Sequence, residues 1–382
     1  MPVVMPIYGT RPEAIKMAPI VAELKKSKVL DCFVTVTGQH RSMLDQVNNL
    51  FGIEPDHDLN IFEPGQSLNG ILARTIDGLE KLFSVNRPDA VIVQGDTTTS
   101  TAAAMAAFYH GIPVVHVEAG LRSGNPSSPF PEEGNRKITS QIASLHLAPT
   151  EGSRRNLLAE NINPADIVVT GNTVIDALLA TVEKNVPFSD PDLEELAASD
   201  QRVLLVTTHR RENQGETMQG IGRALARIAL AEPDLTIVLP VHSNPLVRKA
   251  VLPHLDGLAN VLVTEPLEYG EFTRLLSLAH IVLTDSGGVQ EEAPSLGVPV
   301  LVMRANTERP EAVQAGVVKL IGTDEDRIVS EVERLLHDRD SFHSMSEAMN
   351  PYGDGTAAAR SVAAIQRLTC GASNNLPNST RF

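Results

Sequence analysis

The feature that most constrains the fold is the alternation of apolar, strand-like segments with amphipathic, helical segments along nearly the whole chain. Runs of Val, Ile and Leu, such as residues 3–8, 90–93 and 281–284, are each followed by a polar loop and then by apolar residues at helical spacing. Strands that alternate with helices form parallel sheets, because each parallel connection has to cross over the sheet. The sequence therefore predicts an α/β fold.

The alternation runs in two series. The first ends near residue 170, and the second begins with the apolar run 203–208. Residues 171–192, which are polar and contain two prolines, are interpreted as the connection between the series. A chain of 382 residues is long enough for two domains that each bury a core. We therefore expect doubly wound parallel-sheet domains at residues 1-170 and 171-355, and a disordered polar tail at 371-382.

Composition excludes several classes of function. The net charge of −15 argues against a protein that binds nucleic acid or membrane surfaces in general, so an anionic ligand would need locally placed Arg and Lys. The two cysteines, Cys32 and Cys370, have no metal-ligand spacing and indicate a reducing compartment. No apolar run approaches membrane-spanning length, and the N-terminus is interpreted as a first strand. We expect a soluble, cytoplasmic protein.

Charged residues follow the predicted strands. In open α/β sheets, ligands bind outside the carboxyl ends of the strands. Each charged residue there has an alternative reading as a cap, a surface pair or a solvated loop, but their recurrence at the same sheet edges favours a site. Basic groups suit a diphosphate, and carboxylates suit proton transfer. The residues concerned are Arg11, Lys16, Asp96, Glu118, His209, Arg210, Arg211, Ser286 to Glu292 and Arg309.

The stretch Ser286-Gly287-Gly288 is the main candidate for phosphate binding. It follows a buried strand and opens a helix, where backbone N–H groups can approach an anion and the helix dipole favours negative charge. One turn further on, Glu292 can accept hydrogen bonds from ribose hydroxyls. The alternative is an ordinary strand-to-helix turn capped by Ser286.

Other motifs give weaker signals. Gly220-Ile221-Gly222 lies inside a helical pattern and lacks the third glycine of a dinucleotide fingerprint, so NAD is not expected. Acidic pairs such as Asp324-Glu325-Asp326 are expected by chance in a chain with 47 acidic residues. His116 is interpreted as a core histidine, because no further ligands are placed to complete a zinc site. The sequence therefore predicts neither a cofactor nor a metal.

Seven motifs occur in the same order as in a known family, between about residue 3 and about residue 368. They are Gly9-Thr10-Arg11-Pro12-Glu13, Gln94-Gly95-Asp96-Thr97, His116 to Arg122, Pro131 to Arg136, His209 to Asn213, Asp285 to Gly288 and Thr307 to Glu311. On these motifs the chain resembles the non-hydrolysing UDP-N-acetylglucosamine 2-epimerases.

The resemblance implies a glycosyltransferase-B-like fold of two Rossmann-like domains, with a cleft between them that closes on a UDP-sugar. The C-terminal domain would bind UDP, and a C-terminal helix at 356-370 would pack back on the first domain. It also implies a homodimer and a reversible reaction between UDP-GlcNAc and UDP-ManNAc, by elimination of UDP to a glycal and re-addition. The product would supply ManNAc units for cell-surface polysaccharide.

The resemblance also assigns residues. Asp96, Glu118, Glu132 and His209 are acid/base and positioning candidates; Arg11, Lys16, Ser286, Gly287, Gly288, Glu292 and Arg309 hold the nucleotide and phosphates; and Phe272 contacts the base. Gln39, Arg41, Gln46 and Arg210 lie where a second UDP-GlcNAc can bind as an activator. One position departs from the family, which often has Gln beside the uracil where this chain has Leu267.

The chemistry suits these residues. The C2 hydrogen of a 2-acetamido sugar is weakly acidic, so inversion at C2 needs a placed base, a good leaving group and a second acid for the opposite face. Three alternatives remain open: a hydrolysing relative that releases ManNAc and UDP, a glycosyltransferase on the same fold, and a nucleotide-sugar sensor without catalysis.

Overall fold

The computed structural model describes residues 1–371 and forms two compact α/β units. Unit 1 comprises Met1–Ala177 and the described residues from Tyr352 on, and unit 2 comprises Leu178–Pro351. Apart from Gly371, the tail for which the sequence predicts disorder (371-382) lies outside the described residues.

Unit 1 is built on one eight-stranded sheet in which every described pairing is parallel. The strand order is β4-β3-β1-β5-β6-β7-β8, and β2 also pairs with β1. Every residue of β5 and β6 is buried, and both strands carry apolar side chains on their two faces. This is expected for strands that are covered by helices on both faces of the sheet. The strands are β1 (Val3–Tyr8), β2 (Asp31–Cys32), β3 (Thr35–Val36), β4 (His57–Asp58), β5 (Ala90–Gln94), β6 (Val114–Val117), β7 (Leu145–Ala148) and β8 (Ile167–Val169).

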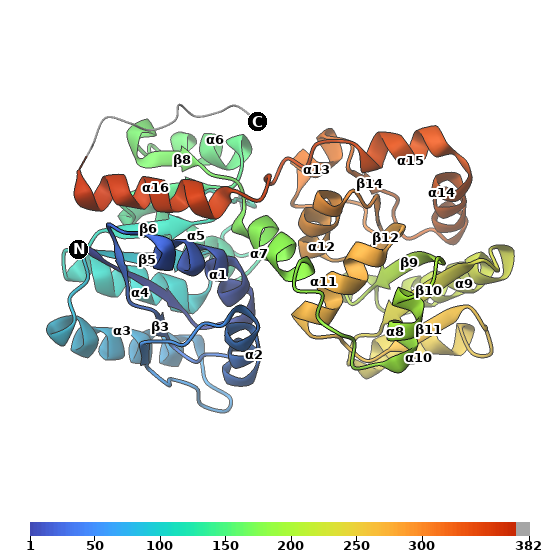
Figure 1. Cartoon of the computed structure of the whole chain (residues 1–382), viewed down its shortest axis with the longest axis horizontal. Coiled ribbons are helices and arrows are strands. Elements are labelled where there is room, and N and C mark those ends of the chain that lie inside the picture. The colour runs from blue at the N-terminus through green and yellow to red at the C-terminus, as the bar shows by residue number, and fades with distance from the viewer. Residues whose placement is uncertain (372–382) are drawn as a thin grey trace. The chain divides into compact units, whose positions relative to one another are not determined.

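Eight α-helices belong wholly or partly to unit 1 within the described chain. The last of them, α16, packs against α1, and its first N–H groups at Ala357 and Ala358 donate to the carboxylate of Asp176 on α7 (Figure 1). The helices are α1 (Arg11–Lys26), α2 (Arg41–Phe51), α3 (Leu68–Val85), α4 (Thr98–Tyr109), α5 (Glu132–Ile142), α6 (Glu151–Ala159), α7 (Thr173–Val182) and α16 (Ala357–Cys370), with a 3-10 turn η1 (Pro164–Asp166).

The connection predicted at 171–192 contains helix α7, which buries Val174, Ile175 and Leu178. The division between the units falls within it, after Ala177. The second strand-forming segment of the chain is divided into β2 and β3, which pair with different parts of β1.

Unit 2 contains a six-stranded parallel sheet with the order β11-β10-β9-β12-β13-β14. Its core packs β9, β10 and β12 against α9 and α14. The strands are β9 (Arg202–Thr207), β10 (Leu235–Pro240), β11 (Val261–Thr264), β12 (Ile281–Thr284), β13 (Val300–Val302) and β14 (Val318–Leu320). The helices are α8 (Pro191–Ala197), η2 (Arg211–Asn213), α9 (Glu216–Ala231), α10 (Pro245–Val251), η3 (Leu252–His254), α11 (Tyr269–Leu278), α12 (Gly287–Glu292), η4 (Ala293–Leu296), α13 (Pro310–Gln314), α14 (Glu325–His337) and α15 (Arg339–Ser346).

In each sheet, the direction in which successive strands are added reverses once. In unit 1 the chain passes from β1 outward to β3 and β4 and then returns to β5 on the other side of β1. In unit 2 it passes from β9 to β10 and β11 and returns to β12. Loops that leave neighbouring strands in opposite directions open a crevice at such a switch point. The loops after β1, β5, β9 and β12 are therefore the structurally favoured places for a ligand.

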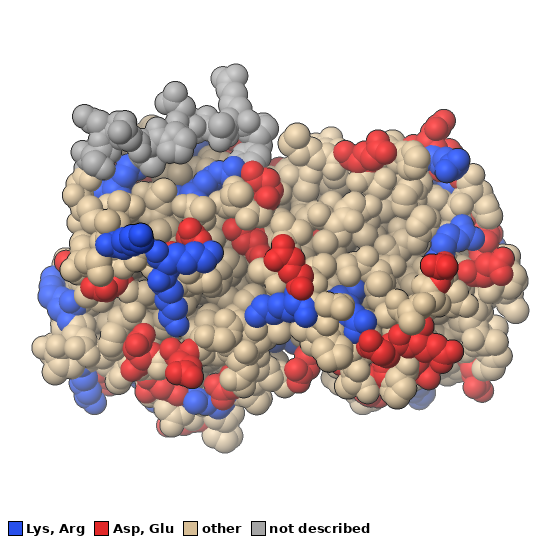
Figure 2. All heavy atoms as spheres, in the orientation of Figure 1, with Lys and Arg blue, Asp and Glu red and all other residues tan. Residues whose placement is uncertain are grey.

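The surface carries mixed charge. Figure 2 shows Lys and Arg in small separate groups between Asp and Glu on the face turned to the viewer. Within the described residues, no helix is both long enough and apolar enough to cross a membrane.

Candidate functional site

Glu118 is held by several side chains at the carboxyl edge of the sheet of unit 1. It directly follows β6 with a φ of +61°, a left-handed conformation that is uncommon for a residue with a side chain. Lys16 Nζ on α1 lies 2.6 Å from both carboxylate oxygens, and Asn172 Nδ2 donates at 3.2 Å. The Gln94 amide donates to the same group. These donors fix the position of the Glu118 side chain.

Asp96 follows β5 and is held from the start of α5. Arg136 donates to Asp96 Oδ2 through Nε at 2.9 Å and approaches it through Nη2 at 2.6 Å. Asn135 Nδ2 donates to the main-chain oxygen of Asp96 at 2.8 Å. Sequence reasoning assigned no role to Arg136 or Asn135, although both lie in one of the seven motifs.

The adjacent residues Glu132 and Glu133 have different environments. Glu133 is fully buried, and it accepts the N–H groups of Ser123 and Gly124 at 3.0 and 3.2 Å and Arg136 at 3.1 Å. Glu132 is half-buried, and its Oε2 is a buried atom without a hydrogen-bond partner in the part of the chain that the structure describes. Glu133 therefore fixes the loop, whereas one buried oxygen of Glu132 has no hydrogen-bond partner among the described residues.

The structure gathers these carboxylates at one sheet edge. β5 and β6 are paired neighbours, so Asp96 and Glu118 leave the sheet side by side. A Cβ atom at Gly95 would lie 3.7 Å from Glu118 Oε2, and Arg136 joins Asp96 to the helix that begins with Glu132. Unit 1 thus presents three acidic groups together with two cations, Lys16 and Arg136.

Glu13 was missed as a positioning residue. Its fully buried carboxylate accepts the N–H groups of Gly9 and Thr10 at 3.0 and 2.8 Å and the Thr97 hydroxyl at 2.6 Å. Burial raises the pKa of Glu13, and these hydrogen bonds oppose the rise. The bonds tie the loop that carries exposed Arg11 to the loop that carries Asp96. The sequence signal was the capping box formed by Thr10 and Glu13 at the start of α1.

The residues expected to bind a second ligand are divided between the units. Gln39 and Arg41 follow β3 and Gln46 lies exposed on α2, whereas Arg210 belongs to unit 2. Arg41 pairs with Asp58 and with Asp45, and the Thr99 hydroxyl donates to Gln39 Oε1 at 2.5 Å.

Asp285 organises the switch point of unit 2. This fully buried carboxylate follows β12 and accepts the Thr208 hydroxyl at 2.9 Å, the Arg210 N–H at 3.0 Å and the Asn213 amide at 3.1 Å. It also accepts the N–H of His209, whose ring Nδ1 lies 3.4 Å from Asp285 Oδ1. Asp285 thereby holds the loop after β9 and orients His209.

The Ser286 to Gly288 stretch begins α12 as predicted. The Ser286 side chain makes no capping hydrogen bond, so the simple cap reading is not supported. A Cβ atom at Gly287 would lie 2.6 Å from Arg309 Nη1, which explains the need for glycine there. Arg309 is held by Glu291, whose Oε1 accepts from Nε at 2.6 Å. The helix start and the guanidinium therefore lie together.

The remaining predicted nucleotide residues lie on or beside α11. The Tyr269 hydroxyl donates to Glu292 Oε1 at 3.0 Å, which links α11 to α12. Phe272 is half-buried in the first turn of α11. Glu268, the N-cap residue of α11, precedes both.

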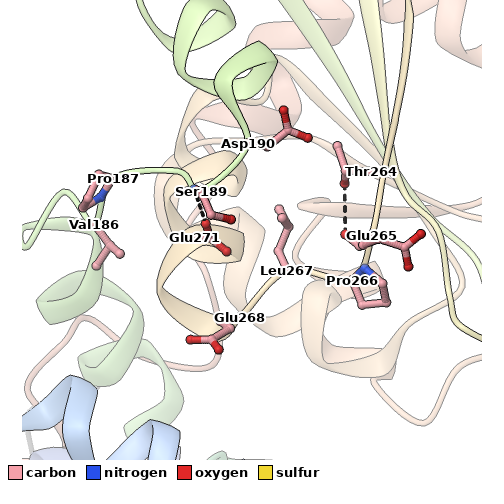
Figure 3. A pocket seen from close by; sticks show the side chains of 10 residues that line it. All are labelled: Val186, Pro187, Ser189, Asp190, Thr264, Glu265, Pro266, Leu267, Glu268 and Glu271. Carbon is pink, nitrogen blue, oxygen red and sulfur yellow. Dashed lines mark hydrogen bonds between the residues drawn. The ribbon is translucent and has the colours of Figure 1, made fainter.

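A pocket of about 660 Å³ opens beside this helix start. Figure 3 shows Leu267 pointing into it, between Thr264 on one side and Ser189 with Glu271 on the other. Its ten lining residues include four carboxylates and neither Lys nor Arg, so a diphosphate is disfavoured there. The lining residues are Val186, Pro187, Ser189, Asp190, Thr264, Glu265, Pro266, Leu267, Glu268 and Glu271.

No group of His, Cys, Asp or Glu among residues 1–371 is arranged to hold a metal ion. His116 is a fully buried histidine, as expected, and burial lowers its pKa to about 3. Its Nε2 donates to the Gly95 main-chain oxygen at 2.8 Å, next to Asp96.

Comparison with known proteins identifies similar chains along almost the whole length. Residues 22–366 match the family model described as UDP-N-acetylglucosamine 2-epimerase. The UDP-N-acetylglucosamine 2-epimerase of Escherichia coli K12 is 53% identical over 369 residues, which cover 95% of this chain and 98% of that protein.

Solved structures are similar as well. The crystal structure of the UDP-GlcNAc 2-epimerase from Neisseria meningitidis bound to UDP-GlcNAc is 46% identical, with a TM-score of 0.84 and coverage of 96% of this chain and 100% of that one. A glycotransferase of kitacinnamycin shares the fold alone, at 14% identity, a TM-score of 0.66 and coverage of 96% and 98%. The fold is thus glycosyltransferase-B-like, as the family resemblance implied.

Proposed function

Because the chain belongs to the UDP-N-acetylglucosamine 2-epimerase family, we propose that it catalyses the reversible epimerisation of UDP-GlcNAc to UDP-ManNAc without net hydrolysis. The observation that carries the proposal is the cluster of Asp96, Glu118 and Glu132 at one sheet edge, with Lys16 and Arg136 bound to it. Inversion at C2 requires acid and base groups on the sugar, and this cluster supplies several.

We assign the leaving group to unit 2. A base takes the C2 proton, the C1–C2 double bond of the glycal forms, and UDP leaves with the electron pair of its C1–O bond. The backbone N–H groups at Ser286 to Gly288 together with Arg309 stabilise the charge that UDP gains. Glu292, held by Tyr269, accepts the ribose hydroxyls. We place the neutral base in the pocket at Leu267. The lining of this pocket contains no cation and therefore suits an uncharged group better than a diphosphate.

The carboxylates divide the proton chemistry in this proposal. Glu132 is the preferred group for proton exchange at the sugar, because one of its oxygens has no partner in the described structure. Glu118 and Asp96, each held by a cation, position the sugar. His209 exchanges or orients a proton near the leaving group.

The wider context follows from the same assignment. The partners are UDP-GlcNAc, UDP-ManNAc and UDP, with the product supplying ManNAc units for cell-surface polysaccharide. We also propose that the protein forms a homodimer. Candidates for its interface are two aromatic side chains at the end of α4, Phe108 and Tyr109, which are 52% and 69% exposed. The cytoplasmic location and a second, activating UDP-GlcNAc site at Gln39, Arg41, Gln46 and Arg210 stay predictions from the sequence.

The test is proton NMR of UDP-GlcNAc with the purified protein in D2O. We expect UDP-ManNAc to appear with deuterium at C2 and the mixture to reach an equilibrium. Glu132→Gln should abolish deuterium exchange, whereas the exposed change Glu151→Gln on α6 serves as a matched control and should leave it intact.

Other products would overturn the proposal. Accumulation of free ManNAc and UDP would identify a hydrolysing enzyme. Consumption of UDP-GlcNAc only when an acceptor is added would identify a glycosyltransferase. Binding of UDP-GlcNAc without any change, also at high substrate concentration, would identify a sensor.

A further inference from the structure

Arg304 is a buried cation of unit 2 to which the proposed reaction assigns no role. It lies in the loop after β13, the direct neighbour of β12 in the sheet, so this loop leaves the same edge as Asp285 and Ser286. The Arg304 side chain is 4% exposed. Arginine is rarely buried to this extent unless its charge is paired. The role of Arg304 therefore has to be inferred from its partners.

The Arg304 guanidinium joins two carboxylates that come from different motifs. Nε donates to Glu212 Oε1 at 2.8 Å, and Nη1 and Nη2 donate to the two carboxylate oxygens of Glu308 at 2.9 and 3.1 Å. Glu212 belongs to the loop after β9 that carries His209, and Glu308 directly precedes Arg309. The two parallel bonds to Glu308 form a bidentate contact, which fixes both groups.

Glu308 lies close to the proposed phosphate ligand Arg309. Its Oε2 is 3.7 Å from Arg309 Nη1, the same nitrogen that would lie 2.6 Å from a Cβ atom at Gly287. Arg309 also donates to Glu291 through Nε. Arg309 therefore faces two carboxylates, and a diphosphate that binds there has to compete with both. Arg304 supplies the charge that compensates Glu308.

The loop after β13 has a second anchor. The Thr307 hydroxyl donates to Gln290 Oε1 at 2.7 Å, and Gln290 Nε2 donates to the main-chain oxygen of Ser286 at 3.0 Å. A substitution at Arg304 should therefore leave this loop attached to the start of α12. Its main effect should be electrostatic.

We propose that Arg304 is a positioning residue for the diphosphate: it binds Glu308, so that this carboxylate neither draws the Arg309 guanidinium away from Gly287 nor repels the phosphates. In this assignment Arg304 acts through Glu308 and does not touch the ligand. The inference rests on the proposed function, in which the start of α12 and Arg309 bind the diphosphate of UDP.

A set of substitutions separates charge compensation from a purely structural role. Arg304→Gln removes the cation and leaves Glu308 charged, whereas Arg304→Lys keeps a cation and loses the bidentate contact. Glu308→Gln removes the charge that Arg304 compensates. If Arg304 acts through Glu308, the combined variant Arg304→Gln/Glu308→Gln should recover what Arg304→Gln loses. Arg334→Gln on α14, which removes an ion pair with Glu331 in the same unit, is the matched control.

The experiment is calorimetry of UDP binding to the full chain, with uridine as the ligand that lacks phosphate. We expect Arg304→Gln to weaken UDP binding about tenfold or more and Arg304→Lys about threefold to fivefold, without a change in the affinity for uridine. The combined variant should bind UDP within about threefold of Glu308→Gln alone. Arg334→Gln should bind UDP as the wild type does.

Two results would overturn the proposal. If Arg304→Gln binds UDP as tightly as the wild type, Glu308 needs no compensation. If the combined variant binds as weakly as Arg304→Gln, the arginine is a structural ion pair that does not act through Glu308. Thermal unfolding without ligand checks that each variant folds; should Arg304→Gln not fold, Arg304→Lys with and without Glu308→Gln decides the same question.

Turnover distinguishes this inference from the proposed function. In Arg304→Gln, kcat/KM for UDP-GlcNAc should fall by at least the factor found for UDP and recover in the combined variant, because Arg309 stabilises the charge that the departing UDP gains. If the wild type binds UDP but forms no UDP-ManNAc, the proposed epimerisation fails, while calorimetry still decides the role of Arg304. A wild-type chain that does not bind UDP would overturn the phosphate site and this inference together.

Discussion

At the scale of single residues, burial and hydrogen bonding separate carboxylates that look alike in the sequence. Glu132 and Glu133 are neighbours, but only Glu133 is saturated by main-chain N–H groups, and only Glu132 keeps a buried oxygen without a partner in the described chain. Glu13 and Asp285 resemble Glu133, since each fixes a loop that carries a site residue. The number of donors that a carboxylate accepts therefore distinguishes positioning groups from groups left for substrate.

Leu267 allows a test of how the base is recognised. Its side chain points into the proposed base pocket (Figure 3), where an amide would find donors and acceptors on uracil. We expect Leu267→Gln to bind UDP about three- to tenfold more tightly, the equivalent of one net hydrogen bond. Calorimetry measures the affinity, and Leu267→Met, of similar size, should bind as the wild type does. Equal affinity in the Gln variant would show that the main chain reads the base.

The buried neutral side chain of His116 should make the folded state less stable at acid pH. Its pKa is about 3 in the folded chain against 6.5 when unfolded, so the unfolded state takes up the proton first as pH falls. The stability associated with neutral His116 is therefore present above pH 6.5 and is lost as pH falls from 6.5 towards 3, by about 1.4 kcal/mol per unit.

A matched variant isolates this effect. His116→Gln keeps an N–H donor for Gly95 but does not titrate. In urea unfolding, the wild type should lose about 2 kcal/mol more than the variant between pH 7 and pH 5. Parallel losses in the two proteins would contradict the assignment.

At the scale of elements, the start of α12 and the residue Arg309 depend on each other. A methyl group at Gly287 must displace the Arg309 guanidinium, because the Cβ would lie 2.6 Å from Nη1. The displaced group is the end of a flexible side chain, so the fold should tolerate the change while the phosphate contacts do not. Gly288 is the matched control, since a Cβ there meets Glu292 Oε2 at an ordinary 3.7 Å.

We therefore expect Gly287→Ala to weaken UDP binding about tenfold or more, the value of one charge-assisted hydrogen bond. Gly288→Ala should bind nearly as the wild type does, and the midpoints of thermal unfolding without ligand should agree within a few degrees. Equal weakening in both variants would mean that backbone flexibility, and not the place of Arg309, controls the affinity.

At the scale of the whole molecule, the two units have separate sheets and separate cores. Units with their own cores can unfold in separate transitions. Since most of the proposed UDP contacts lie in residues 178–351, UDP should raise the transition of that unit most. At a UDP concentration one hundred times Kd the stabilisation is about 2.7 kcal/mol, which corresponds to a shift of roughly 5–10 °C.

Scanning calorimetry with and without UDP checks this expectation. The transition of unit 1 should move by less than half as much as that of unit 2. A single transition, shifted as a whole, would contradict independent unfolding of the two cores. If UDP shifted the transition of unit 1 and left that of unit 2 unchanged, the assignment of the nucleotide contacts to unit 2 would be wrong.

The sequence by itself determined the fold class, the order of most strands and helices along the chain, and the family. These follow from local periodicity and from ordered motifs, which are properties of neighbouring residues. Helix α7 was not predicted, because residues 171–192 were interpreted as a connection on the basis of their polar residues and two prolines. Helices α6 and α10 were not predicted for a similar reason, since each offers only two buried positions.

Only the tertiary structure decided the order of strands in each sheet and the partners of each charged group. The return from β4 to β5 and from β11 to β12 creates the two switch points, and no local pattern encodes such a return. Lys16 with Glu118 and His209 with His242 are separated by 102 and by 33 positions, and they meet because their strands or helices pack together. The residue type gives the charge of a side chain. Its desolvation and its hydrogen-bond donors come from distant segments of the chain. The distinction between a positioning carboxylate and one available to substrate is therefore a property of the folded chain.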